Sequence, residues 1–284
     1  MIRLAIRVGG EQAEVVLAEL LDLAPAGVEE TVLEDGRVEY AVYGPPGELP
    51  ALPDLQALAG GAPVEISTSE IADDWSERWK DFHRPVLITA SAPAVPAIRV
   101  RPPWEPIEHA DATHVIELVI DPGQAFGTGA HATTRLCLEL LLGLAGSSPW
   151  RGEVLDLGTG SGVLAIAAAK LGFQPVVAID HDPLSVQAAQ ENAAANGVSL
   201  DVRRVDLRSD EIPSTPMVLA NLLRAGLLHY AHTLERPPET LIASGLLIEE
   251  ADDIASAFAA HGLRELERRQ GGEWVALCLN RGEH

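Results

Sequence analysis

Hydrophobic residues in the first 70 positions recur with two spacings, one typical of strands and one typical of a helix. Residues 2–8 alternate between apolar and polar side chains and predict a strand, whereas residues 11–23 predict an amphipathic helix. The next segments continue as two strands joined by a turn, a short helix and a last strand, at 27–33, 37–43, 53–60 and 63–70. This order predicts a small ferredoxin-like α+β domain over residues 1–70.

From residue 153 onward, short apolar runs alternate with helical patterns. The runs predict strands at 153–157, 175–180, 200–205, 216–222 and 240–248, and the helical patterns fall at 161–171, 183–196, 223–234 and 249–261. Such alternation predicts a mostly parallel sheet with helices on both faces. The last segment, 263–280, predicts an antiparallel hairpin with a Gly-Gly turn. An α/β, Rossmann-like seven-stranded sheet that ends in a hairpin resembles class I methyltransferases more than the usual dinucleotide dehydrogenase.

Two segments connect these halves. Residues 73–85 predict a charged helix that ends at Pro85, and residues 89–106 form a proline-rich extended segment that leads into the second half. We therefore predict three parts, which are a small domain at 1–70, a helical linker at 71–84 and a larger α/β domain at 85–284.

The charge of the chain narrows the class of partner. The 284 residues carry a formal net charge of −22, and residues 1–70 hold only Arg3, Arg7 and Arg37 against thirteen acidic residues. Nucleic-acid binding normally requires a basic patch, so we expect no direct contact with nucleic acid. The charge favours a basic protein partner, with plain solubility as the alternative explanation.

Other bulk features predict a cytoplasmic protein. Hydrophobic residues make up 47% of the chain, yet no apolar run is long enough to span a membrane, and no signal-peptide pattern is present. The two cysteines, Cys137 and Cys278, have no metal-binding spacing and fit a reducing compartment. We therefore expect neither a membrane nor a metal ion to take part in the function.

A glycine motif, Asp-Leu-Gly-Thr-Gly-Ser-Gly, follows the first predicted strand of the sheet at 156–162. Ligands of such sheets bind at this edge, where glycines let the backbone approach them. A dinucleotide fingerprint counted from Gly158 would place its third small residue at Val163, which is too bulky. Gly160 and Gly162 instead leave room for an adenosine with an amino-acid tail. The alternative is a tight strand-to-helix turn with no ligand.

Acidic residues follow the second strand. Asp180 lies 18 residues after Gly162, where a carboxylate can accept hydrogen bonds from both ribose hydroxyls of a nucleoside. Asp182 precedes Pro183 and predicts the N-cap of the next helix. The Asn196-Gly197 pair predicts an ordinary C-terminal stop of that helix.

Asn221 ends the fourth strand and is expected beside the same crevice. A helix cap is the alternative role for a lone asparagine there. Leu222 and Leu223 follow in place of the Pro-Pro-aromatic run that adenine and amide methyltransferases carry, which argues against an adenine or amide acceptor.

Residues 121–142 combine a glycine-rich turn with the start of an apolar helix. The turn resembles a phosphate-binding loop but lacks its lysine. Either Thr133 or Thr134 could cap the helix. Phe126, between glycines, is predicted to line an acceptor pocket, with the core as its alternative. His131 has three candidate roles, as general base, loop anchor or solvated side chain.

These blocks together resemble the ribosomal protein L11 methyltransferases, a bacterial family that trimethylates amines of that ribosomal protein. The resemblance covers the whole chain, and its most specific block is Ala-Phe-Gly-Thr-Gly-Ala-His-Ala-Thr-Thr at 125–134. It implies contacts to the cofactor S-adenosylmethionine from Thr134, Gly158, Asp180 and Asn221.

The resemblance also implies a reaction. The expected enzyme methylates lysine side chains, and also α-amino groups, of ribosomal protein L11, which its acidic N-terminal domain holds. Asn221 would orient the amine, Phe126 would tolerate growing methyl bulk, and water or His131 would receive the proton. The alternatives are a class I methyltransferase acting on another translation protein or a small amine, and a ribosome-associated binding module without activity.

Overall fold

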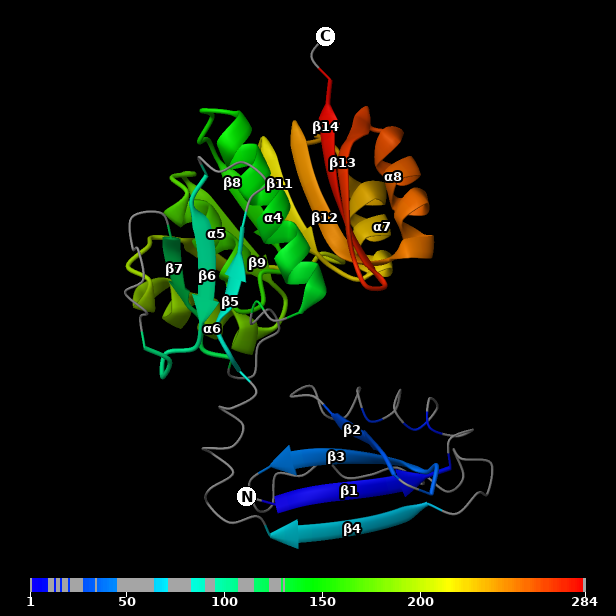
Figure 1. Ribbon diagram of the computed structural model, residues 1–284. Coiled ribbons are helices and arrows are strands. Elements are labelled where there is room, and N and C mark those ends of the chain that lie inside the picture. The colour runs from blue at the N-terminus through cyan, green and yellow to red at the C-terminus, as the bar shows by residue number, and fades with distance from the viewer. Residues whose placement is uncertain are drawn as a thin grey trace. The chain divides into compact units, whose positions relative to one another are not determined.

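The computed structural model divides the chain into two compact units, Met1–Phe82 and His83–His284. It describes residues 2–9, 13, 16, 20, 28–33, 35–44, 64–70, 83–89, 95–106, 115–122, 129 and 131–282 (Figure 1). The predicted second helix at 53–60 and the linker helix lie outside these residues, apart from the last three positions of segment 73–85. Each unit is described by itself.

The first unit contains one antiparallel sheet. Its strands are β1 (Ile2–Val8), β2 (Glu29–Val32), β3 (Val38–Gly44) and β4 (Glu65–Glu70), in the order β2-β3-β1-β4. Alternate residues of β1 pack against one face of a helix that includes Ala13, Val16 and Leu20. This order and pairing are those of a ferredoxin-like sheet, so the predicted fold of this part is confirmed.

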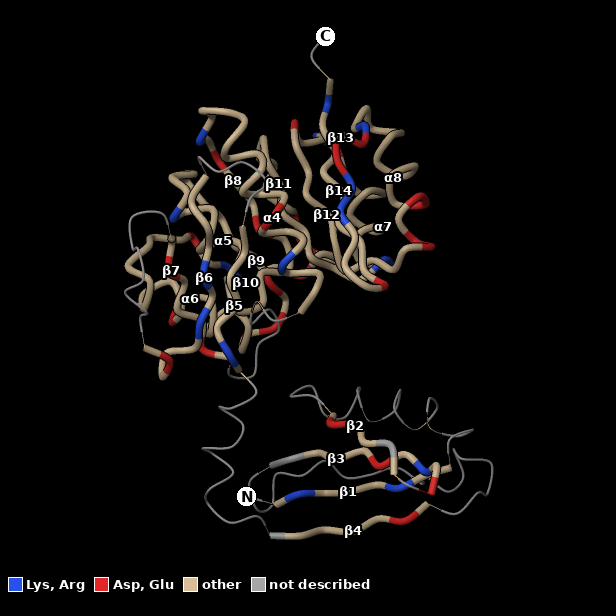
Figure 2. The backbone as a smooth tube through the Cα atoms, viewed as in Figure 1, with Lys and Arg blue, Asp and Glu red and all other residues tan. Residues whose placement is uncertain are grey.

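All three arginines of this sheet are ion-paired within it. Arg3 and Arg7 both donate to the buried carboxylate of Glu39, whose pKa they lower. Arg37 pairs with Asp35 at 2.8 Å and with Glu65 at 3.0 Å. Figure 2 shows these charges on neighbouring strands. All the arginines of residues 1–70 are therefore paired within this part of the chain, while ten of its thirteen acidic residues take no part in these ion pairs.

The second unit is built on a seven-stranded sheet with the order β10-β9-β8-β11-β12-β14-β13. The first five strands in this order run parallel, and β14 and β13 form the antiparallel hairpin. Their bounds are β8 Val154–Leu157, β9 Val176–Asp180, β10 Asp201–Arg204, β11 Met217–Asn221, β12 Thr240–Leu247, β13 Leu263–Gly271 and β14 Trp274–Arg281. This arrangement confirms the predicted fold class.

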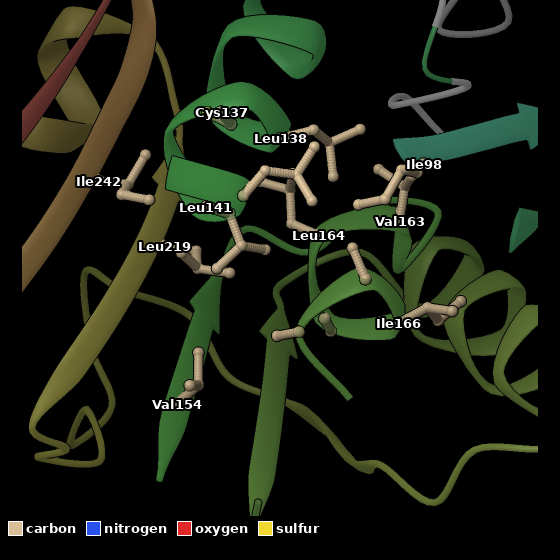
Figure 3. Packing of buried hydrophobic residues seen from close by; sticks show 14 of the residues in the cluster. Ile98, Cys137, Leu138, Leu141, Val154, Val163, Leu164, Ile166, Leu219 and Ile242 are labelled. Carbon is tan, nitrogen blue, oxygen red and sulfur yellow. The ribbon is translucent and has the colours of Figure 1, made fainter. Parts of the chain in front are cut away.

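Helices cover both faces of this sheet. They are α4 Ala132–Ser147, α5 Val163–Lys170, α6 Pro183–Ala195, α7 Arg224–Thr233, the short η3 Ile248–Glu250 and α8 Ala251–Ala259. One core lies between α4, α5 and the sheet, where Leu141, Val154 and Leu219 meet (Figure 3). A second core lies under α7 and α8 on the opposite face and includes Leu155 and Phe258. Residues of β8 alternate between the two cores, as expected for a strand covered on both sides.

A small three-stranded sheet was not predicted. It consists of β5 (Val86–Ile88), β6 (Ala97–Arg101) and β7 (Val115–Val119), with β6 antiparallel to β5 and parallel to β7. The proline-rich segment was interpreted only as an extended connection. Its prolines flank β6 without interrupting it, and Ile98 and Val100 are buried in the core with α4 and α5. Among the described residues, no helix is long and apolar enough to cross a membrane.

Candidate active site

The glycine motif forms a turn that only glycines can make. Gly158, Gly160 and Gly162 have φ angles of 74°, 53° and 84°, in the left-handed region. The backbone N–H groups of Gly158 and Thr159 both donate to the carbonyl of Ile179 at 2.9 Å, which ties the turn to β9. A Cβ atom on Gly158 would lie 2.3 Å from the side chain of Leu222, so the turn is also closely covered.

Asp180 joins this turn from the end of β9. Its Oδ2 atom accepts a hydrogen bond from Gly160 N at 2.9 Å, and its Oδ1 atom accepts from Asp182 N at 3.0 Å. Asp182 caps α6 through Leu184 N, as predicted. The structure therefore brings Asp180 and the glycines together at the carboxyl edge of neighbouring strands.

Asp156 lies beneath the turn and was counted in the sequence only as part of the motif. Its Oδ2 atom accepts from Thr159 Oγ1 at 2.7 Å and from Ala165 N at 3.0 Å. Burial raises the pKa of this carboxyl to about 7, and the nearby charge of Asp180 contributes in the same direction. Asp156 is thus a buried link between β8, the turn and α5.

The raised pKa of Asp156 predicts a specific dependence of stability on pH. The unfolded carboxyl ionises near its ordinary pKa of about 3.9, whereas the folded one keeps its proton until about 7. The unfolded state therefore binds fewer protons in this window, and the contribution of Asp156 to stability falls as pH rises through it. The loss has an upper bound of about 1.4 kcal/mol per pH unit.

We expect an Asp156→Asn variant to lose less stability than the original protein between pH 5 and pH 8. Urea unfolding of both proteins at the two pH values measures this difference directly. The asparagine can still accept from Thr159 and Ala165, so the comparison isolates the charge. Equal pH dependence in the two proteins would contradict the assignment.

Asn221 and Thr134 meet across the edge of the sheet. Asn221 ends β11, and its Nδ2 atom donates to Thr134 Oγ1 at 3.3 Å. The alternative that Asn221 only caps the next helix is excluded, because α7 begins at Arg224 with Leu223 at its N-cap. Thr134 is completely buried in the first turn of α4.

His131, and neither threonine, caps α4. The helix begins at Ala132, and Thr133 N donates to His131 Nδ1 at 3.4 Å. The alternative that Thr133 or Thr134 is the cap was wrong, because both residues lie inside the helix, where their hydroxyls contact His131 and Asn221. Burial lowers the pKa of His131, and Arg135 adds to the effect. His131 therefore acts as an anchor at the start of α4, while its role as a base remains a prediction.

Trp274 was missed as a site residue. It begins β14, and its ring contacts that of His131 edge to face with 5.0 Å between the ring centroids. The Gly-Gly-Glu-Trp sequence contains a hairpin signal but nothing that places the indole at this edge. Of the glycine-rich turn before α4, Gly129 is described and packs against Val100, whereas Phe126 lies outside the described residues.

A β-bulge in β12 supports the end of β11. The register with β14 shifts between Ala243 and Leu246, and Gly245 has a φ of 86°. Leu222 N donates to Ser244 O at 3.0 Å, and a Cβ atom on Gly245 would lie 2.3 Å from the carbonyl oxygen of Leu222. The bulge, with no side chain at Gly245, therefore leaves space for the backbone of Leu222, the residue after Asn221.

Comparison with known proteins finds a matching family and similar proteins. Residues 53–282 match the family model described as ribosomal protein L11 methyltransferase (PrmA). The chain is 41% identical over 231 residues to a ribosomal protein L11 methyltransferase of Geobacter metallireducens, covering 79% of this chain and 72% of that protein. It is 35% identical over 298 residues to one of Syntrophotalea carbinolica, covering 93% of both chains.

A solved structure is also similar. The crystal structure of a ribosomal protein L11 methylase from Lactobacillus delbrueckii subsp. bulgaricus superposes with a TM-score of 0.59 at 32% identity. The match covers 69% of this chain and 99% of that one.

Proposed function

Since this chain belongs to the ribosomal protein L11 methyltransferase family, we propose that it transfers methyl groups from S-adenosylmethionine to amines of ribosomal protein L11. The observation that carries the proposal is the match of the family model over residues 53–282, which include every described residue of the candidate site. The chain is accordingly a protein methyltransferase of the class I fold.

The candidate site fits the cofactor. Gly158 and Gly160 place no side chain in the turn, and the carboxylate of Asp180 adjoins it. Each oxygen of that carboxylate accepts one backbone N–H, and Oδ1 also lies 3.3 Å from His181 Nδ1. The Oδ2 atom keeps a second lone pair that suits a ribose hydroxyl. We assign cofactor binding to the three glycines of the turn, to Asp180 and to the Thr134–Asn221 pair. When bound, the cofactor supplies an electrophilic methyl group on a sulfonium.

The acceptor amine must lose its proton before it can take the methyl group, because only a lone pair can attack carbon. The pKa of a free lysine is about 10.4, and transfer into an apolar site lowers it. Asn221 donates through its amide nitrogen to Thr134, so the carbonyl oxygen on the other arm of the planar amide points away from Thr134. That oxygen is suited to accept a hydrogen bond from the amine and orient its lone pair.

His131 is less suited to accept the proton. Its Nδ1 atom lies 2.8 Å from Thr133 Oγ1 and accepts from Thr133 N at 3.4 Å, so this nitrogen is already engaged at the start of α4. Protonation of Nδ1 would remove the cap of α4. We therefore assign His131 to anchoring, with proton release to water.

An Asn221→Ala variant is expected to lower kcat by about 10²-fold, because the amine loses its orienting acceptor. Cofactor affinity should fall less than kcat, since the glycines and Asp180 are unchanged. Steady-state kinetics and calorimetric titration with S-adenosylmethionine separate the two effects. A variant that retains the original kcat would remove Asn221 from the chemistry.

The function is tested by incubating the protein with S-adenosylmethionine and purified ribosomal protein L11, followed by intact-mass measurement of the substrate. We expect stepwise gains of one methylene mass, with up to three methyl groups on each modified lysine. A panel of other ribosomal proteins and small amines tests the alternative acceptors. Methylation of a panel member without methylation of L11 would refute the proposed substrate and leave the reaction type standing.

We further propose that residues 1–70 hold the protein substrate. The internal pairing of Arg3, Arg7 and Arg37 leaves the domain with a surplus of acidic side chains. Such a surface attracts a basic protein and repels nucleic acid.

A further inference from the structure

Two buried asparagines lie one turn apart at the end of α6. Asn192 and Asn196 are 3% and 7% exposed, although amide side chains are normally at the surface. A buried amide destabilises the fold unless both its ends find partners. The partners of these two side chains therefore indicate what they are for.

Asn196 pairs with β7. Its Oδ1 atom accepts from Val119 N at 2.9 Å, and its Nδ2 atom donates to Val119 O at 2.6 Å. The side-chain amide thus makes the two hydrogen bonds with the backbone of Val119 that a neighbouring strand would otherwise make. The Nδ2 atom also donates to Asn192 O at 2.8 Å, within the same helix end. None of these three bonds involves the glycine turn. The sequence interpretation of Asn196 as an ordinary helix stop describes its backbone and misses this second role.

Asn192 has one partner in each of two segments. Its Nδ2 atom donates to Ser161 O at 2.9 Å, within the glycine turn. Its Oδ1 atom accepts from Asp121 N at 2.9 Å, where the chain leaves β7 towards His131 and α4. The planar amide of Asn192 therefore fixes the distance between the glycine turn at Ser161 and the backbone at Asp121. A rotated amide would face a donor with a donor and an acceptor with an acceptor, so its orientation is determined.

We propose that Asn192 is a positioning residue that couples cofactor binding at the glycine turn to the position of the backbone at Asp121, just after β7. This inference rests on the proposed function, because the turn is the assigned cofactor site. Asn192 does not touch the reacting atoms. It bonds to Ser161 on one side and to Asp121 on the other. A displacement of the glycine turn therefore also displaces the backbone at Asp121, and the reverse holds as well.

Asn196 provides a matched control. Asn196 lies at the end of the same helix and is also buried. It binds the backbone of Val119 in β7, but it makes no bond to the glycine turn. In each case, replacement by aspartate keeps the shape and the acceptor atoms and removes the donor. Asn192→Asp places a carboxylate oxygen against Ser161 O, whereas Asn196→Asp places one against Val119 O.

The experiment compares the two variants with the original protein in three measurements: the Kd for S-adenosylmethionine, kcat for methyl transfer and thermal stability. We expect both variants to lose Tm to a similar degree. Asn192→Asp should in addition weaken cofactor binding and lower kcat, each by about 10-fold or more, whereas Asn196→Asp should keep both within about threefold. Equal losses in the two variants, or none in Asn192→Asp, would overturn the proposal.

Hydrogen exchange separates this proposal from the proposed function. In Asn192→Asp without any ligand, we expect faster exchange at both Gly160–Gly162 and Asp121, and in Asn196→Asp only near Val119. If the original protein bound no S-adenosylmethionine, the proposed function would fail while this exchange pattern still tested the coupling. Faster exchange in Asn192→Asp at only one of the two segments would refute the coupling itself.

Discussion

Replacing Gly245 by alanine should lower the rate of methyl transfer by about 10²-fold, the cost typical of a displacement near 1 Å at a reacting group. The added Cβ atom would lie 2.3 Å from the carbonyl oxygen of Leu222, which is backbone and cannot rotate away. The segment after β11 must therefore move, and Asn221 with it. The left-handed φ of 86° adds strain of roughly 1–2 kcal/mol.

Gly262→Ala is the control for this strain. Gly262 has a φ of 82°, but nothing lies within 4 Å of the position of its Cβ atom. Both variants should lose stability through backbone strain, while only Gly245→Ala should lose kcat at saturating cofactor. Thermal unfolding and initial rates measure the two quantities. If Gly262→Ala lost as much activity, the effect would reflect general destabilisation.

Removing residues 1–70 should abolish methyl transfer to ribosomal protein L11 and leave the affinity for S-adenosylmethionine within about threefold of that of the full chain. The reason is that all the assigned cofactor residues belong to the second unit, which has its own two cores. In our proposal, the surplus of acidic residues in 1–70 raises the local concentration of a basic substrate.

Two measurements distinguish this role from a loss of folding. Calorimetric titration shows whether the truncated protein still binds cofactor, and a short lysine peptide at high concentration shows whether it still transfers methyl groups. We also expect the full chain to lose substrate affinity as salt rises, because exposed charges are screened over about 8–10 Å at 0.1–0.15 M. Full transfer to L11 by the truncated protein would refute the recognition role.

The sequence predicted the elements of the second unit well because its local and tertiary preferences agree. Buried strands such as Val154–Leu157 are short apolar runs, and helix starts such as Asp182-Pro183 have strong local signals. The order of strands in the ferredoxin-like sheet followed from the order of elements alone. Each of these features depends on residues that are close in the chain.

The features that were missed depend on distant residues. His131 caps α4 in place of a threonine, and Thr134 instead pairs with Asn221, 87 positions away in the chain. The bond from Asn192 to Asp121 spans 71 positions, and the fit of Gly245 depends on the backbone of another strand. Periodicity and propensity report only local environment, so such contacts leave no recognisable pattern in one sequence.

The second unit buries its thiols. Cys137 and Cys278 lie in the core, and burial raises the pKa of each to about 12. Thiolates are stronger nucleophiles than amines and would compete for an activated methyl group. Lys170, one of only two lysines in the chain, lies in the last turn of α5, at the end opposite the glycine turn. The two thiols are therefore shielded by the core, and Lys170 stands away from the glycine turn, so none of these three nucleophiles is placed to intercept the methyl group.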